Sequence, residues 1–165
     1  MITIFMTTET IWSILAEVPD PEIPALNIVE MGIVRDVRAE GNTWIVDITP
    51  TYSGCPAMKA IEEDVREVLV ELKLESFDVR TVISPPWTTD WMTEEAREKL
   101  RMEGIAPPLY SSADKRSIMG VSREILCPRC RSKETKMISQ FGSTACKSLY
   151  VCESCKEPFD YFKCI

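Results

Sequence analysis

Seven cysteines provide most of the chemistry that this sequence of 165 residues can offer, and histidine is absent. Without an imidazole, the chain lacks the usual general base of serine and cysteine hydrolases and the histidine ligands of facial-triad and Rieske iron sites. Any metal is therefore expected on sulfur or carboxylate ligands. Six of the cysteines follow residue 126, namely Cys127, Cys130, Cys146, Cys152, Cys155 and Cys164.

Two CxxC pairs form the most specific motif. Cys127 and Cys130 make one knuckle, and Cys152 and Cys155 make the second, with 21 residues between them. Each pair aims two thiolates at one point, which predicts a closed, tetrahedral zinc-ribbon site. We favour structural zinc because a tail of about 40 residues with few large apolar side chains needs metal binding to fold. An Fe-S cluster or redox chemistry on the same thiolates is the alternative.

The other two cysteines of the tail, Cys146 and Cys164, have two interpretations. Free cysteines are commonly buried as small hydrophobic side chains, and we favour this role over exchange with the metal ligands. The aromatic residues of the tail are expected to pack around the metal site; they are Tyr150, Phe159, Tyr161 and Phe162.

The lone cysteine of the first part, Cys55, lies between a predicted strand and a predicted helix that opens with Pro56. This places Cys55 at the helix N-cap, where unpaired backbone N–H groups and the helix dipole lower a thiol pKa. The negative charges of Glu62 and Glu63 would instead raise this pKa. On these residues alone, a reactive or metal-binding thiolate and a cysteine tucked under the turn are equally supported.

Two further segments carry side chains of interest. Asp20 and Glu22 lie in a loop stiffened by Pro21 and Pro24, although carboxylates in such loops more often form turns than bind metals. Trp87 and Trp91 precede a predicted helix. Aromatic residues there more often close a core, but exposed ones would anchor a partner.

Apolar periodicity predicts elements in the order αββαβα. Helical spacing occurs before Pro19, after Pro56 and between a Thr93 cap and Gly104, with strand alternation elsewhere. The expected elements are a helix over 10–18, strands over 33–39 and 43–49, a helix over 56–73, a strand over 77–83 and a helix over 93–104. The strands on either side of the long helix should be parallel. The predicted fold class is α+β, a small layered domain with a mixed sheet followed by a four-cysteine zinc-ribbon module.

Charge divides the chain into two parts. Residues 1–110 hold nine Lys and Arg against 20 Asp and Glu, whereas residues 111–165 hold ten against six. The Pro107-Pro108 pair and the polar stretch after it predict a domain over 1–108, a linker over 109–124 and a zinc ribbon over 125–165. The sequence shows neither a signal peptide nor a membrane span, so a cytoplasmic location is expected.

Three of these segments together resemble a known family. Asp20-Pro-Glu-Ile-Pro, Ile28-Val-Glu-Met-Gly-Ile-Val and Thr51-Tyr-Ser-Gly-Cys-Pro-Ala resemble the small domain of SUF-type iron-sulfur assembly accessory proteins over about residues 9–105. Pro86-Trp-Thr-Thr-Asp-Trp-Met, Gly104-Ile-Ala-Pro-Pro, and the tail segments Phe141-Gly-Ser-Thr-Ala-Cys and Glu157-Pro-Phe-Asp-Tyr-Phe-Lys-Cys narrow this to the PaaD-like family of the phenylacetyl-CoA epoxidase system.

This resemblance implies a non-enzymatic accessory protein encoded with the multicomponent oxygenase of phenylacetate degradation. Its implied task is the assembly or delivery of an Fe-S cluster to the reductase subunit of that system. The family's functional cysteine maps onto Cys55, with Thr51 in the same motif, and its acidic loop onto Asp20 and Glu22. The implied cargo is transient iron or an Fe-S cluster, beside a structural zinc.

Competing functions remain open on the sequence alone. Because a [2Fe-2S] cluster usually has four ligands, Cys55 would need a homodimer, the tail cysteines or the client to complete the site. The main alternative is a structural docking subunit of the oxygenase complex, anchored by Trp87 and Trp91, without cluster chemistry. A nucleic-acid-binding ribbon is disfavoured by the acidic first part. An oxidoreductase is disfavoured because the chain has no glycine-rich dinucleotide fingerprint, P-loop or histidine.

Overall fold

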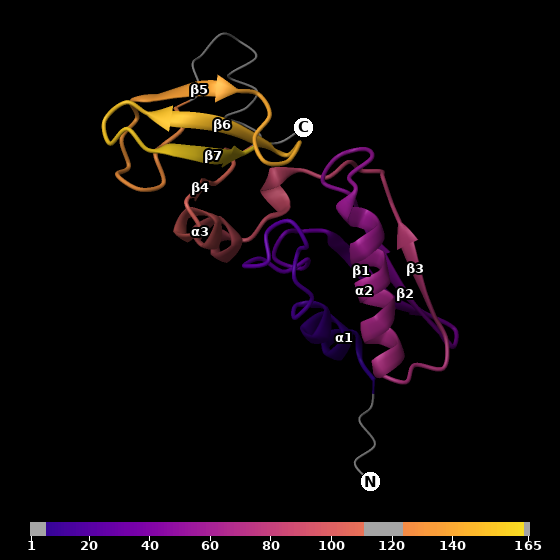
Figure 1. Ribbon diagram of the computed structural model, residues 1–165. Helices are drawn as coiled ribbons and strands as arrows, with labels where there is room; N and C mark the ends of the chain where they lie inside the picture. The colour runs from indigo at the N-terminus through magenta and orange to yellow at the C-terminus, as the bar shows by residue number, and fades with distance from the viewer. Residues whose placement is uncertain (1–5, 111–123, 164–165) are drawn as a thin grey trace. The chain divides into compact units, whose positions relative to one another are not determined.

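The computed structural model describes residues 6–110 and 124–163. The chain divides into two compact units, Met1–Trp87 and Thr88–Ile165 (Figure 1). Within the described residues, no helix combines the length and apolarity needed to cross a membrane. Mixed α and β elements occur in both units, which confirms the predicted α+β class.

The first unit contains a three-stranded mixed sheet and two helices. Its elements are α1 (Thr8–Leu15), β1 (Val34–Glu40), β2 (Thr43–Ile48), α2 (Ala57–Glu71) and β3 (Phe77–Thr81). The strand order is β1-β2-β3; β1 and β2 form an antiparallel hairpin, and β2 and β3 are parallel as predicted. The predicted boundaries agree to within a few residues, the usual uncertainty at element ends.

An apolar core holds this unit together. Ile61, Val65 and Leu69 recur every four residues along α2, and each is at most 1% exposed. Ile45 and Val46 are neighbours on β2 and therefore point to opposite faces of the sheet, yet both are buried. The central strand is consequently covered on both sides, as expected for a strand with a parallel partner.

The second unit begins with two short helices and ends with a four-stranded sheet. Its elements are η1 (Thr89–Trp91), α3 (Glu94–Met102), β4 (Ile105–Ala106), β5 (Thr135–Ser139), β6 (Lys147–Cys152) and β7 (Pro158–Phe162). The strand order is β4-β7-β6-β5, parallel between β4 and β7 and antiparallel elsewhere. The Thr93 hydroxyl accepts from the Ala96 N–H as the predicted N-cap of α3, and Gly104 follows α3 with φ 77°.

The division between the units falls earlier than the predicted boundary at residue 108. Residues 88–108 belong to the second unit because β4 pairs with β7, and because the buried Arg97 donates to the carbonyl oxygens of Thr89 (2.6 Å) and Pro108. Leu109 extends this connection, since its N–H donates to the Tyr161 hydroxyl at 3.3 Å. The predicted linker falls mostly on residues 111–123, outside the described chain.

Candidate metal centre and cysteine loop

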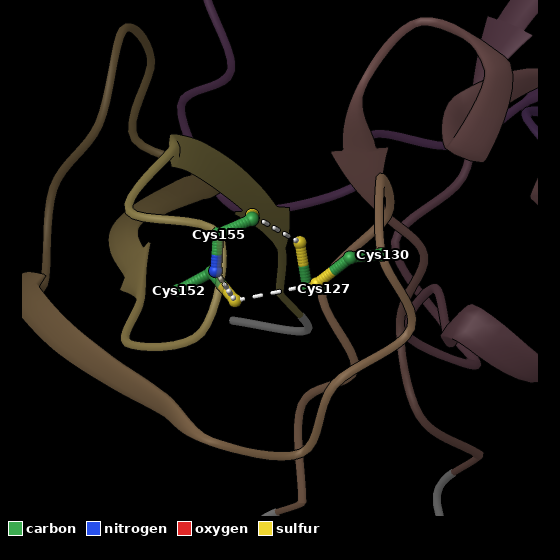
Figure 2. Close-up of side chains that lie close together, drawn as sticks. All are labelled: Cys127, Cys130, Cys152 and Cys155. Atoms are coloured by element: carbon green, nitrogen blue, oxygen red, sulfur yellow. Dashed lines mark hydrogen bonds between the residues drawn. The ribbon is translucent and has the colours of Figure 1, made fainter.

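Four cysteines of the second unit converge on one point. The Sγ atoms of Cys127, Cys130, Cys152 and Cys155 all lie within 4.8 Å of one another. Figure 2 shows the sulfurs paired across the two knuckles, Cys127 with Cys155 at 3.8 Å and Cys130 with Cys152 at 3.5 Å. Four thiolates bound tetrahedrally at about 2.3 Å from one metal ion would lie about 3.8 Å apart. The sulfur spacing therefore fits one tetrahedral metal ion.

The pKa values of these thiols also favour the binding of a cation between them. The Cys155 N–H donates to the Cys152 Sγ at 3.5 Å, and this hydrogen bond is the main reason that the pKa of Cys152 is lowered to about 6. At Cys155 the Glu157 N–H lowers the pKa, but burial and the three neighbouring thiols together raise it to about 12. Successive ionisation thus becomes costly, and a divalent cation removes that cost.

Each knuckle is closed by the same backbone geometry. The Arg131 N–H donates to the Cys127 carbonyl at 3.0 Å, and the Lys156 N–H donates to the Cys152 carbonyl at 2.9 Å. Both residues are left-handed, with φ of 65° and 64°. Glycine adopts this conformation most easily, so the sequence pattern alone did not mark these two positions.

Aromatic side chains and a polar bridge hold the two knuckles together. Cys127 and Cys152 lie in one buried cluster with Tyr150, Phe159 and Tyr161. This agrees with the predicted packing of those three aromatics, whereas Phe162 is buried outside the cluster. On the solvent side the Ser132 and Ser154 hydroxyls lie 2.8 Å apart, and Ser154 donates to Glu134 at 2.9 Å.

Cys146 is not part of the metal centre. It is 4% exposed, its Sγ lies 3.0 Å from the Thr144 hydroxyl, and it is absent from the four-cysteine group. These contacts fit the favoured role of a buried small side chain. Cys164 lies outside the described residues.

Cys55 lies in the loop between β2 and α2, and its side chain is half-buried. The N-cap of α2 is Pro56 rather than Cys55, and the helix begins at Ala57. The one-residue shift arises because Pro56 already has helical torsion angles, while the Cys55 carbonyl accepts from the Met58 N–H at 3.3 Å. Cys55 therefore precedes the first turn of the helix. Thr51, in the same loop, is also half-buried.

The acidic loop does not form a ligand cluster with Cys55 in the described chain. Asp20 is 5% exposed, and its Oδ1 accepts from the N–H groups of Glu22 at 2.9 Å and Ile23 at 2.7 Å. Asp20 therefore shapes its own loop. Among the described residues, three or more metal-ligating groups come together at the four tail cysteines, and neither Asp20 nor Glu22 is among them.

The backbone segment 26–33 contacts three features of the first unit: the acidic loop, the Cys55 loop and Trp87. Its Leu26 carbonyl accepts from the Asp20 N–H at 2.8 Å, and its Ile33 carbonyl accepts from the Thr49 N–H at 2.8 Å, where the chain enters the Cys55 loop. The Trp87 indole N–H donates to the Met31 carbonyl at 3.0 Å. The acidic loop, the cysteine loop and Trp87 are thus attached to one backbone segment.

The tryptophans differ from the expected pair of exposed anchors. Trp87 is 6% exposed and packs into the first unit, because its indole N–H needs the Met31 carbonyl. It does not offer the surface that partner binding would need. Trp91 is half-buried at the end of η1, in the second unit.

Sequence reasoning missed one polar residue beside the cysteine loop. Thr49 directly follows β2 and is 1% exposed, and its hydroxyl makes no hydrogen bond to any described residue. Buried hydroxyls are rarely left without a partner, so this residue marks an unusual position at the entrance to the Cys55 loop. A threonine at the end of a strand carries no pattern that predicts this.

Comparison with known proteins identifies the family. The chain is 50% identical over 155 residues, 94% of its length, to one component of the "Putative 1,2-phenylacetyl-CoA epoxidase" of Escherichia coli K12, and it covers 92% of that protein. Residues 111–163 match the PaaD zinc beta ribbon domain, and residues 8–82 match the iron-sulfur cluster assembly protein family. The chain belongs to the PaaD family.

The first unit has relatives of its own. Ninety-seven residues, 58% of this PaaD-family chain, are 34% identical to the Fe-S protein maturation auxiliary factor YitW of Bacillus subtilis and cover 94% of it. The crystal structure of a domain of unknown function, DUF59, from Bacillus anthracis matches 56% of the chain and 90% of its own length, with 32% identity and a TM-score of 0.52. The predicted fold and family of the first unit are confirmed.

Proposed function

We propose that this PaaD-family protein assists the assembly or delivery of an Fe-S cluster to the reductase subunit of a phenylacetyl-CoA epoxidase system, as an accessory protein and not as a catalyst. The observation that carries the proposal is the separation of its cysteines: four are used in one centre, while Cys55 lies half-buried in another unit. The maturation factors related to the first unit support the same role.

In this proposal the four-cysteine centre holds structural zinc. Its thiolates are spaced for one tetrahedral ion, and two of them, Cys127 and Cys152, are buried in the aromatic cluster. A zinc ion there would supply folding free energy and no redox chemistry. The ribbon would then be a rigid module for contact with the client.

Cys55 is the proposed handling site for the cargo, which is iron or an Fe-S cluster. Its half-buried thiol is accessible to a second protein, and the cysteine and acidic loops are both fixed to segment 26–33. One thiolate supplies one of the four ligands that such a cluster usually needs. The remaining ligands would come from a second copy of the chain or from the client, so cluster binding is transient. Reduced thiols of this kind suit the predicted cytoplasmic location.

The test is the cluster content of the client in cells that carry a Cys55→Ser variant. The [2Fe-2S] content of the purified reductase subunit should fall several-fold, while the variant protein itself should retain its fold and zinc. Cys146→Ser is the matched control, because it makes the same substitution at a cysteine that also lies outside the metal centre. Unchanged cluster loading with Cys55→Ser, together with stable co-purification with the epoxidase, would assign a docking role without cluster chemistry.

A further inference from the structure

A groove on the second unit lies outside both the metal centre and the cysteine loop. It is formed by α3, the segments 106–110 and 124–126 and the first knuckle, and its volume is about 540 Å³. This volume is within the range of ligand-binding clefts. We call it the α3 groove; its apolar lining includes Ala106, Pro108, Leu109, Ile125, Leu126 and Pro128.

The carboxylates on the rim of the α3 groove are already neutralised by cations of the same unit. Glu98 accepts from the Arg101 guanidinium at 2.8 Å, and Glu124 from Lys133 at 2.8 Å. The Glu94 Oε1 lies 3.6 Å from the Nε of the buried Arg97 and also accepts from the Tyr110 hydroxyl. A cationic ligand would therefore have to displace existing partners from every one of these carboxylates.

Arg131 differs from the other charged residues that line the groove. Its side chain is exposed, and its guanidinium makes no hydrogen bond or ion pair with any other described residue, although its charge lowers the pKa of Glu98. The knuckle holds its backbone rigidly, through the bond to the Cys127 carbonyl. The result is a guanidinium without a hydrogen bond or ion pair to the described residues, carried on a backbone that the knuckle fixes beside an apolar surface.

We propose that the α3 groove binds a short segment of a protein partner in which a bulky apolar side chain stands next to carboxylates. The apolar side chain would bury against Leu109 and Leu126, and a carboxylate would accept two hydrogen bonds from Arg131, the geometry that guanidinium groups favour. Charge complementarity selects an acidic segment, since a basic one would meet Arg131 without finding a free carboxylate. This assigns the groove to recognition of the partner and does not depend on the chemistry of Cys55.

The experiment uses ¹⁵N-labelled, zinc-loaded full-length chain and the peptide acetyl-Glu-Leu-Leu-Glu-Asp-amide. Titration should shift the amide signals of Leu109, Leu126 and Arg131 in a saturable way. A peptide with lysine in place of every acid, and one with glycine in place of both leucines, should shift them far less. Arg131→Glu should weaken binding by about tenfold and Arg131→Gln by less, because each changes the pairing charge. Lys136→Glu is the matched control, since it makes the same charge change on β5, outside the groove.

Several outcomes would overturn this assignment. They are the absence of shifts at the groove, equal binding of the basic peptide, or full affinity in Arg131→Glu with its zinc content intact. Shifts that depend on protein concentration without peptide would assign the groove to a second copy of the chain. Binding that occurs only after residues 112–122 are replaced by a glycine-serine linker would assign it to that segment of the chain.

Discussion

The two units use cysteine in opposite ways. In the second unit, two members of the seven-residue buried cluster are the metal ligands Cys127 and Cys152, so the core and the metal centre are one structure. In the first unit the core consists of side chains such as Ile61 and Leu69, and Cys55 lies outside it in a half-exposed loop. The apolar core of the first unit is built without Cys55, whereas two cysteines form part of the buried cluster of the second unit.

Metal removal should have the largest effect, and it should affect the second unit alone. Chelation at neutral pH, or Cys152→Ser, should unfold the sheet of the second unit, because structural zinc contributes about 10–16 kcal/mol in small zinc modules. Amide signals from β1, β2 and β3 should persist. Two-dimensional NMR of the zinc-free protein checks this directly, with Cys146→Ser as the control that keeps both zinc and the β6 signals. Simultaneous loss of both units would contradict the contrast between them.

A smaller effect is expected when a substitution creates a cavity in the core of the first unit. Leu69→Ala removes a fully buried side chain from α2 and should lower the free energy of unfolding of that unit by about 2–5 kcal/mol. Zinc content should be unchanged. The neighbouring Val70 is 62% exposed, so Val70→Ala should cost less than about 0.5 kcal/mol. Chemical denaturation followed by NMR or circular dichroism measures both variants, and equal effects would mean that α2 does not pack as described.

Local patterns predicted much of this structure. The period of α2 and the Thr93 cap are properties of neighbouring residues, so they could be read from the sequence. The CxxC spacing likewise predicted the metal centre, because a knuckle is a local turn. The parallel pairing of β2 and β3 followed from the intervening helix and the handedness of such crossovers.

Features that depend on distant contacts were not predictable in the same way. β4 has two residues and no periodicity, and its pairing with β7 shifts the division of the chain to residue 87. The burial of Trp87 depends on a carbonyl 56 positions earlier in the chain. The left-handed Arg131 occupies a position where glycine would be expected, so no residue preference indicated its conformation.

The most direct test is the metal and acid-labile sulfide content of anaerobically reconstituted protein, measured for the native chain, Cys55→Ser and Cys146→Ser. We expect about one zinc per chain in all three, since the described residues bring four thiols together at one point. We also expect additional iron and sulfide in the native chain and in Cys146→Ser, and their loss in Cys55→Ser. Equal iron and sulfide in Cys55→Ser, or iron in place of zinc at the four-cysteine centre, would contradict the proposed division of roles.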